Sequence, residues 1–300
     1  MSQEKILLVV LGPTASGKTD LSIRLASFFS TEIVSADSRQ VFREMKIGTA
    51  RPDESEWQHV PHHLLGHRSI HETYNAGIFE EEALACIASI HQKNKTAILC
   101  GGTGFYIQSV LEGFDDVPSR DEEIRSKLTQ EYESAGIEFL QQKLLQLDPA
   151  FYQVAELQNP QRLIRALEII LVTGKSPLEL RSGKAKDRPW RSIYIMPDLP
   201  REVLYDRINK RVDQMIEAGM ENEARNLFPY RHLNALQTVG YSEWFSFFEG
   251  EISREKAIEL IKQHTRNYAK RQLTWFRKLP DVHLVDPHLP IEKIVQQIGL

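Results

Sequence analysis

Eight consecutive residues near the start of the chain have the types and spacing that hold phosphate groups. They are Gly12, Pro13, Thr14, Ala15, Ser16, Gly17, Lys18 and Thr19, and they fit G-x-x-x-x-G-K-[ST] at every fixed position. In this pattern the backbone N–H groups curl around a phosphate, the lysine adds a positive charge and Thr19 offers a hydroxyl to Mg²⁺. An apolar run before the loop and a helical pattern after it argue against a chance glycine turn. The loop predicts a bound pyrophosphate, but not by itself the transfer of a phosphoryl group.

A second polar cluster follows the expected strand at 32–36. It consists of Asp37, Ser38, Arg39 and Gln40. Because parallel strands deliver their carboxyl ends to one edge of a sheet, we expect Asp37 beside the phosphate loop. Its carboxylate could ligate Mg²⁺ or accept a proton there, or it could simply cap the following turn. Arg39 and Gln40 suit recognition of a planar polar group such as a nucleobase.

The expected strand at 96–100 ends in glycines instead of an acidic residue. Gly101, Gly102, Thr103 and Gly104 follow it. Motor and switch NTPases usually hold Mg²⁺ with an Asp or Glu at this place. Glycines allow close backbone approach, and Thr103 can donate its hydroxyl to a phosphate oxygen. This favours a transferase that uses the loop to hold a substrate over an ATPase.

Two stretches concentrate positive charge, although the whole chain has a net charge of −4. Gln161, Arg162 and Arg165 fall within about 100° of arc on an expected helix whose other side is apolar. Residues 266–278 interleave cations with aromatic side chains, a combination that suits single-stranded RNA. Each stretch could instead be a solvated helix face. The overall negative charge means that any RNA surface must be a local patch.

Strand patterns at 6–11, 32–36, 96–100, 192–196 and 282–285 alternate with helical ones, which predicts an α/β fold with a parallel sheet flanked by helices. Helical periodicity at 124–132, 137–147 and 161–172 interrupts this alternation. We therefore predict a core formed by 1–115 and 190–300, and an inserted all-helical domain at 116–189. Residues 115–119 and 182–189 are its expected hinges.

The composition limits the number of domains, the cysteine chemistry and the cellular location that we expect. The 300 residues, 41% of them hydrophobic, suffice for one large and one smaller domain. Cys86 and Cys100 form no CxxC pair, which argues against a disulfide framework or zinc finger. Without a signal peptide or an apolar stretch of membrane-spanning length, we expect a cytoplasmic protein. The histidines from His59 to His71 favour a hydrogen-bonding loop near the ligand over a metal site.

Seven motifs together resemble the bacterial tRNA dimethylallyltransferases, also called isopentenyl-tRNA transferases. They span almost the whole chain in the family's order: GPTASGKT at 12–19, DSRQ at 37–40, PHHL at 61–64, GGTGFY at 101–106, QRLIRALE at 161–168, TVGY at 238–241 and TRNYAKRQLTWF at 265–276. Phe105 stands where many members have Leu. The chain ends at Leu300 without the C-terminal zinc finger of eukaryotic relatives, which points to a bacterial form.

The resemblance implies a P-loop NTPase-like fold, Mg²⁺, and transfer of a dimethylallyl group from dimethylallyl diphosphate to the N6 amine of the adenosine 3′ of a tRNA anticodon. By matching position, Asp37 is the expected base, and Thr103 and Arg125 flank the reacting centre. The implied tRNA contacts are Asp37, Ser38, Arg39, Gln40, Gln161, Arg162, Leu163, Ile164 and Arg165. We expect a monomer.

Three other classes compete with this interpretation. A small-molecule or nucleoside kinase shares the phosphate loop and a strand-end Asp, but it gives no reason for the segment 265–276. A prenyltransferase acting on free adenine nucleotides would not need an insertion carrying Arg162 and Arg165. A non-catalytic RNA-binding protein would not need an intact Lys18 and Thr19.

Overall fold

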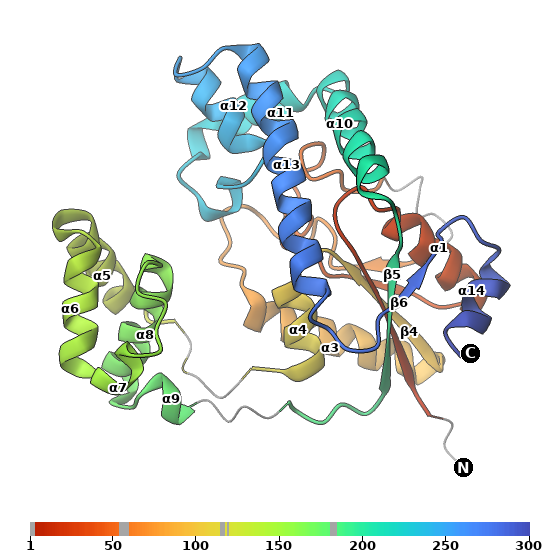
Figure 1. Ribbon diagram of the computed structural model, residues 1–300, viewed down its shortest axis with the longest axis horizontal. Helices are drawn as coiled ribbons and strands as arrows, with labels where there is room; N and C mark the ends of the chain where they lie inside the picture. Colours follow the sequence, from red (N-terminus) through yellow and green to blue (C-terminus); the bar gives the residue numbers. More distant parts are fainter. Residues whose placement is uncertain (1–3, 54–59, 115–117, 119, 181–184) are drawn as a thin grey trace. The chain divides into compact units, whose positions relative to one another are not determined.

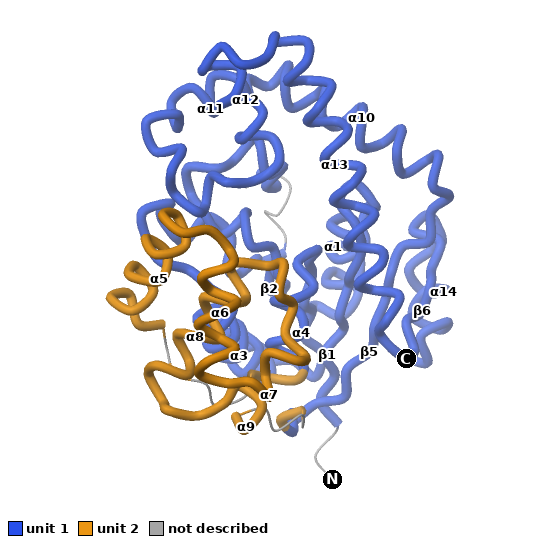
Figure 2. The backbone as a smooth tube through the Cα atoms, turned by 60° about the vertical axis from the view of Figure 1, so that its left-hand side comes forward, with its two compact units in different colours: residues 1–111, 187–300 blue, residues 112–186 orange. Residues whose placement is uncertain are grey.

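The computed structural model describes residues 4–53, 60–114, 118, 120–180 and 185–300. The chain forms two compact units: residues 1–111 with 187–300, and residues 112–186 (Figure 2). The predicted insertion at 116–189 overlaps the second unit, which begins and ends a few residues earlier. Parts of both predicted hinges, at 115–117, 119 and 182–184, lie outside the described residues.

The first unit contains a six-stranded parallel sheet (Figure 1). Its strands are arranged in the order β3-β2-β4-β1-β5-β6. Its strands are β1 (Ile6–Leu11), β2 (Ile33–Ser35), β3 (His62–His63), β4 (Thr96–Gly101), β5 (Arg191–Pro197) and β6 (His283–Val285). Five of them were predicted. The two-residue β3 was not, because two histidines carry no strand signal. All residues of β1 are buried, as expected for a central parallel strand covered on both faces.

Helices surround this sheet because its strands are apolar on both faces. Ile6, Leu8 and Val10 of β1 share one core cluster with Leu25 of α1 and Val295 of α14. The helices that belong to the sheet layer are α1 (Lys18–Phe29), α3 (Ala76–Lys93), α4 (Gly104–Glu112) and α14 (Ile291–Gln297). No described helix is both long and apolar enough to cross a membrane.

A second core in the same unit gathers the helices that follow β5. Tyr241 and Trp244 are fully buried there, together with Met220 and Leu236. The elements around this core are α10 (Arg201–Glu217), α11 (Met220–Leu227), the 3₁₀ turns η1 (Phe228–Tyr230) and η2 (Asn234–Leu236), α12 (Tyr241–Phe248) and α13 (Arg254–Phe276). Helix α13 reaches from this core back to the sheet layer (Figure 1).

The second unit is all-helical and has a core of its own, built around Leu128, Leu140, Leu144 and Leu167. It contains α5 (Glu122–Ala135), α6 (Ile137–Leu147), α7 (Pro149–Tyr152), α8 (Pro160–Thr173) and α9 (Pro177–Leu180). Asn159 caps α8 through the Arg162 N–H, with Pro160 at the first helical position.

Candidate active site

The phosphate loop lies between β1 and α1, as the motif predicts. Gly12 and Gly17 have φ values of +154° and +88°, so both need the freedom of glycine. Gly17 is also the N-cap of α1, which directs the positive end of the helix dipole at the loop. This is the arrangement of an anion site at a helix N-terminus.

Lys18 curls back onto its own loop, where its Nζ donates to the Pro13 carbonyl at 3.3 Å. Burial lowers the pKa of the Lys18 ammonium, while the nearby Cys100 and Asp37 raise it. An ammonium taken out of water with so few fixed partners is well placed to exchange its carbonyl contact for an anion.

Asp37 lines the same pocket as Lys18 and Thr19. Its Oδ1 accepts hydrogen bonds from the Arg39 and Gln40 N–H groups at 2.9 and 3.2 Å, so it does cap the following turn. Oδ2 has no hydrogen bond from any residue that the structure describes. The two roles left open by the sequence therefore fall on different oxygens: one fixes the turn, and the other can serve a ligand.

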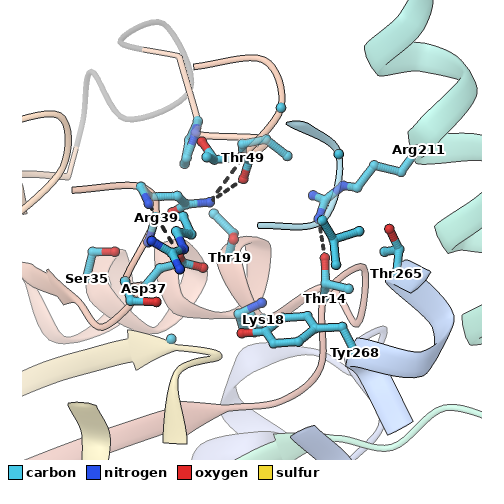
Figure 3. Close-up of a pocket in the computed structure, with 18 of the residues that line it drawn as sticks. Thr14, Lys18, Thr19, Ser35, Asp37, Arg39, Thr49, Arg211, Thr265 and Tyr268 are labelled. Atoms are coloured by element: carbon cyan, nitrogen blue, oxygen red, sulfur yellow. Dashed lines mark hydrogen bonds between the residues drawn. The ribbon is translucent and has the colours of Figure 1, made fainter. Parts of the chain in front are cut away.

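The two side chains that follow Asp37 hold neighbouring segments in place. Arg39 donates to the carbonyl oxygens of Asn234 and Ala235 at 3.1 and 3.2 Å, and burial lowers its pKa. Gln40 donates through Nε2 to the Thr49 and Ala50 carbonyls at 3.0 and 3.2 Å (Figure 3). These contacts shape the pocket, and contact of Arg39 and Gln40 with tRNA stays a prediction.

Thr103 is tied to the turn at Asp37. Its Oγ1 accepts from the Ser38 N–H at 3.0 Å and donates to the Ser38 hydroxyl at 3.3 Å. The Thr103 N–H donates to the Ala36 carbonyl at 3.2 Å. The loop after β4 thus positions the residues on either side of Asp37.

The glycines around Thr103 serve packing against protein. A Cβ at Gly101 would lie 2.1 Å from the Ala36 carbonyl oxygen, and one at Gly104 would lie 2.4 Å from the Trp275 ring. At Gly102 it would lie 2.4 Å from Nε2 of Gln272. The close backbone approach inferred from these glycines is confirmed, but each glycine approaches another part of the protein: Ala36, Gln272 or Trp275.

Helix α13 closes the site in a way that its sequence did not reveal. The buried Gln272 accepts from the Thr14 N–H at 2.9 Å and donates to the Gly102 carbonyl at 2.8 Å, joining the two glycine-rich loops. Tyr268 lines the pocket, and its burial raises the pKa of its phenol to about 12. Part of the stretch predicted for RNA therefore builds the pocket, while Lys270, Arg271 and Trp275 stay exposed.

Arg211 on α10 is a site residue without a sequence motif. Its Nη1 donates to the Thr14 hydroxyl at 3.4 Å, and its charge lowers the pKa of Lys18 (Figure 3). The apolar part of the pocket wall comes from the same helix and its neighbours: Ile208, Val212, Met215, Met220, Val239 and Ile261. The pocket thus combines a cationic end with an apolar wall.

The predicted residues of the insertion form a network around one buried carboxylate. Glu168 is fully buried and pairs with Arg165 at 3.1 Å and Arg125 at 3.4 Å. Arg125 also donates to the Gln161 Oε1 at 2.8 Å. Arg162 lies outside this network: it is exposed and pairs with Glu156.

Two apolar residues of the same motif, Leu163 and Ile164, were wrongly predicted to contact RNA. Leu163 and Ile164 are each only 1% exposed and belong to the core of the insertion. Their side chains leave no surface for RNA. Any RNA contact along α8 falls to its polar residues. The role of Arg125 near the reacting centre stays a prediction.

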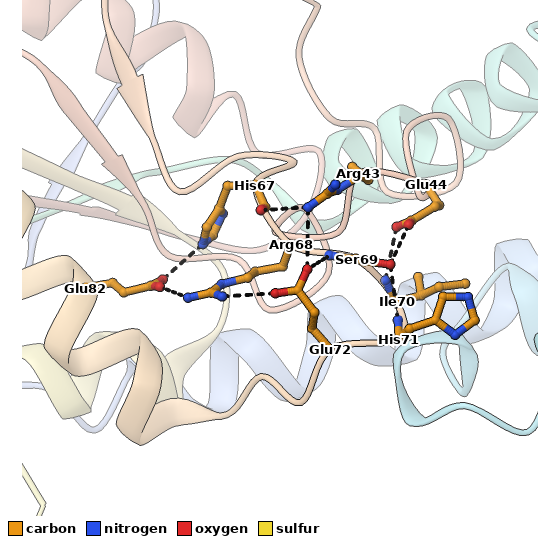
Figure 4. Close-up of polar contacts among 9 residues, drawn as sticks. All are labelled: Arg43, Glu44, His67, Arg68, Ser69, Ile70, His71, Glu72 and Glu82. Carbon is orange, nitrogen blue, oxygen red and sulfur yellow. Dashed lines mark hydrogen bonds and ion pairs between the residues drawn. The ribbon is translucent and has the colours of Figure 1, made fainter.

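The described histidines act as hydrogen-bonding groups. His62 lines the pocket and its Nδ1 lies 2.8 Å from the Val60 carbonyl, while His63 pairs with Glu32 at 2.6 Å. His67 pairs with Glu82, which also holds Arg68 (Figure 4). No metal-binding group of three His, Cys, Asp or Glu occurs among the residues with described positions. His59 lies outside them, and the His71 ring packs on Tyr230.

The chain is similar to several known proteins. The sequence model of the IPP transferase family matches residues 40–279. A tRNA dimethylallyltransferase of Christiangramia forsetii is 51% identical over 276 residues, which are 92% of this chain and 91% of that protein. One of Cytophaga hutchinsonii is 47% identical over 283 residues, which are 94% of this chain and 93% of that protein.

Two solved structures are similar over most of the chain. The full-length tRNA isopentenylpyrophosphate transferase of Bacillus halodurans superimposes with a TM-score of 0.71 at 38% identity, covering 99% of this chain and 94% of that one. A eukaryotic dimethylallyltransferase acting on tRNA gives a TM-score of 0.81 at 30% identity, covering 94% of this chain and 74% of that one.

Proposed function

The chain belongs to the IPP transferase family, and on that premise we propose that it transfers a dimethylallyl group from dimethylallyl diphosphate to tRNA. The acceptor is the N6 amine of the adenosine 3′ of the anticodon, and diphosphate is released. The observation that carries the proposal is the pocket that joins Lys18 and Arg211 at one end to an apolar wall and to Oδ2 of Asp37, which accepts no hydrogen bond from the described residues.

The reaction needs catalysis at the amine nitrogen of adenine and at the diphosphate oxygen that leaves. The adenine amine is a weak nucleophile because its lone pair is delocalised into the ring, but an allylic carbon can bear positive charge as its C–O bond breaks. The new N–C bond forms while that C–O bond breaks, and the electron pair leaves with diphosphate. Lys18, Arg211 and the N–H groups of the phosphate loop would stabilise the developing negative charge.

Asp37 would take the amine proton through Oδ2 while Oδ1 keeps the turn fixed. The target base cannot reach this pocket while it is stacked, so it must be flipped out of the anticodon loop. We propose that Thr103 and Arg125 flank the reacting centre and that Ser38, Gln161, Arg162 and Arg165 contact the tRNA around it.

The Mg²⁺ ion expected for this family fits the donors present. Thr19 lines the pocket and supplies one hydroxyl, and Mg²⁺ often takes its remaining oxygens from substrate phosphates and water. When bound, the ion would neutralise diphosphate charge. Thr19→Val should weaken the Mg²⁺ dependence of the reaction more than it weakens tRNA binding.

A labelling assay tests the proposal against its rivals. Labelled dimethylallyl diphosphate and labelled ATP are each offered with unmodified tRNA and with AMP. We expect label from the prenyl donor on tRNA alone. Transfer from ATP would make the chain a kinase, and label on AMP would make it a nucleotide prenyltransferase. We also propose that the enzyme is a cytoplasmic monomer, which sedimentation and cell fractionation can test.

A further inference from the structure

One carboxylate on α11 collects four hydrogen bonds from a loop and a ring. Glu223 accepts from the N–H groups of Lys46, Ile47 and Gly48 at 3.0, 2.8 and 2.8 Å, and from the Tyr241 hydroxyl at 2.6 Å. Three consecutive N–H groups turned toward one anion form an anion-binding concavity of the kind that loops use for phosphates. Here the anion is a side chain from a segment 175 residues away along the sequence.

The surroundings make this arrangement rigid. Tyr241 is fully buried, and both its burial and the nearby Glu223 raise the pKa of its phenol, so the hydroxyl keeps its proton and donates. A Cβ at Gly48 would lie 2.6 Å from the Tyr241 hydroxyl, so the loop is pressed directly against the ring. The loop has no room to shift toward α12.

The same loop is a wall of the active-site pocket. Gly48, Thr49 and Ala50 line it together with Lys18 and Asp37. The Thr49 and Ala50 carbonyls accept from the Gln40 side chain, and the Gln40 N–H donates to Oδ1 of Asp37. Hydrogen bonds therefore connect Glu223, through the loop at 46–50 and Gln40, to the carboxylate that faces the substrate.

We propose that Glu223 is a positioning residue for prenyl transfer, which holds the loop at 46–50 in the shape that receives the flipped base and keeps Asp37 aimed at its amine. The proposal rests on the function proposed above. The cationic end of the pocket comes from other segments, the phosphate loop and Arg211. Loss of Glu223 should therefore affect the tRNA side of the reaction and spare the diphosphate side.

Glu223→Gln tests this with little change in size. The new amide nitrogen carries N–H groups and faces N–H or O–H donors, so at least one backbone group loses its acceptor. We expect kcat/KM for tRNA to fall by about 10-fold or more, with the KM for dimethylallyl diphosphate within about twofold of wild type.

The matched control is Glu221→Gln on the same helix. Glu221 pairs with Arg225 at 3.3 Å and Arg254 at 2.8 Å on the surface, so the substitution makes the same charge change away from the loop. It should leave both kinetic parameters within about twofold. Tyr241→Phe, which keeps the carboxylate and removes one donor, should lower kcat/KM for tRNA a few-fold in the same direction.

The outcomes separate the possible failures. If Glu223→Gln matches wild type, or if it raises both KM values equally, the positioning role is wrong. Should Glu223→Gln fail to fold, Tyr241→Phe decides, and unchanged tRNA parameters in that variant would reject the proposal. Wild-type enzyme that transfers no prenyl group to tRNA would overturn the proposed function itself, independently of either variant.

Discussion

Two glycine-rich loops follow the neighbouring strands β1 and β4, and glycine serves a different purpose in each. In the loop after β1, Gly17 has φ +88°, while a Cβ there would find nothing closer than 3.6 Å. At the end of β4, where the second loop begins, Gly101 would place a Cβ 2.1 Å from the Ala36 carbonyl oxygen. Gly17 is needed for the backbone shape of the first loop, and Gly101 is needed for close packing where the second loop begins.

The two loops therefore have different roles in the site. Thr14, Lys18 and Thr19 of the first loop line the pocket, so changes there should alter substrate binding. The second loop holds the end of β2, from which Asp37 projects, so changes there should alter stability and the position of the base. Asp37 depends on both loops, because it lines the same pocket as the first loop and is positioned by the second.

Asp37→Asn should have the largest effect, because it removes the proton acceptor while the Asn carbonyl can still cap the turn. We expect a rate loss of roughly 10²–10⁴-fold, the scale of a missing general base. Single-turnover rates with saturating tRNA measure it, and tRNA affinity should change far less. An equal fall in affinity would make Asp37 a binding residue and leave the loops without a shared catalytic group.

Gly101→Ala should destabilise the fold by about 3 kcal/mol, the upper range for overpacking, because the clash is with rigid backbone. Urea unfolding measures it. Gly77→Ala is the control: among the described residues its added Cβ would meet only the Asn75 side chain, at 3.3 Å, and alanine favours a helix. Equal stability of the two variants would remove the distinction between the loops.

Lys18→Ala should leave the free energy of unfolding almost unchanged and lower kcat/KM for dimethylallyl diphosphate by about 10- to 100-fold. The lost charge acts on the bound substrate and on the departing diphosphate alike, so KM should rise and kcat should fall. Steady-state kinetics with varied diphosphate substrate measure both. Wild-type turnover in this variant would show that the first loop does not hold the leaving group.

Arg162→Gln, in the second unit, should give the smallest effect and leave the diphosphate site of the first unit unchanged. If Arg162 meets a phosphate of single-stranded RNA, the slope of log K for tRNA against log salt should flatten by about 0.7. Dimethylallyl diphosphate affinity is the control and should not change. Parallel salt titrations would reject the contact. Arg165→Gln is less informative, because it removes a partner of the buried Glu168 and should destabilise the insertion.

Most of the fold was predictable because its signals are local. Apolar runs marked the strands from β1 to β6 except β3, and helical periodicity at 161–172 marked α8. β3 was not predicted, because its two residues form a strand only through their pairing with β2 and carry no strand signal of their own. The sequence also placed the insertion within a few residues, since helical periodicity replaced strand signals there.

The site was predictable only where a motif carries it. Lys18 and Asp37 follow from short patterns. Arg211 reaches the pocket from a distant helix without a motif, and Gln272 reaches it from a stretch that was predicted to bind RNA. The same limit applies to Glu168, a buried charge that gives Arg125 and Arg165 an internal role. Long-range pairing of charges leaves no mark on a single sequence.

The order of strands in the sheet also bears on synthesis of the protein. β1 pairs with β4 on one side and with β5 on the other, and β5 begins only at Arg191. A nascent chain therefore has an open edge on its central strand until the whole insertion has been made, and open apolar edges invite aggregation. An insertion with its own core can fold during that interval and leave the sheet to close when β5 emerges.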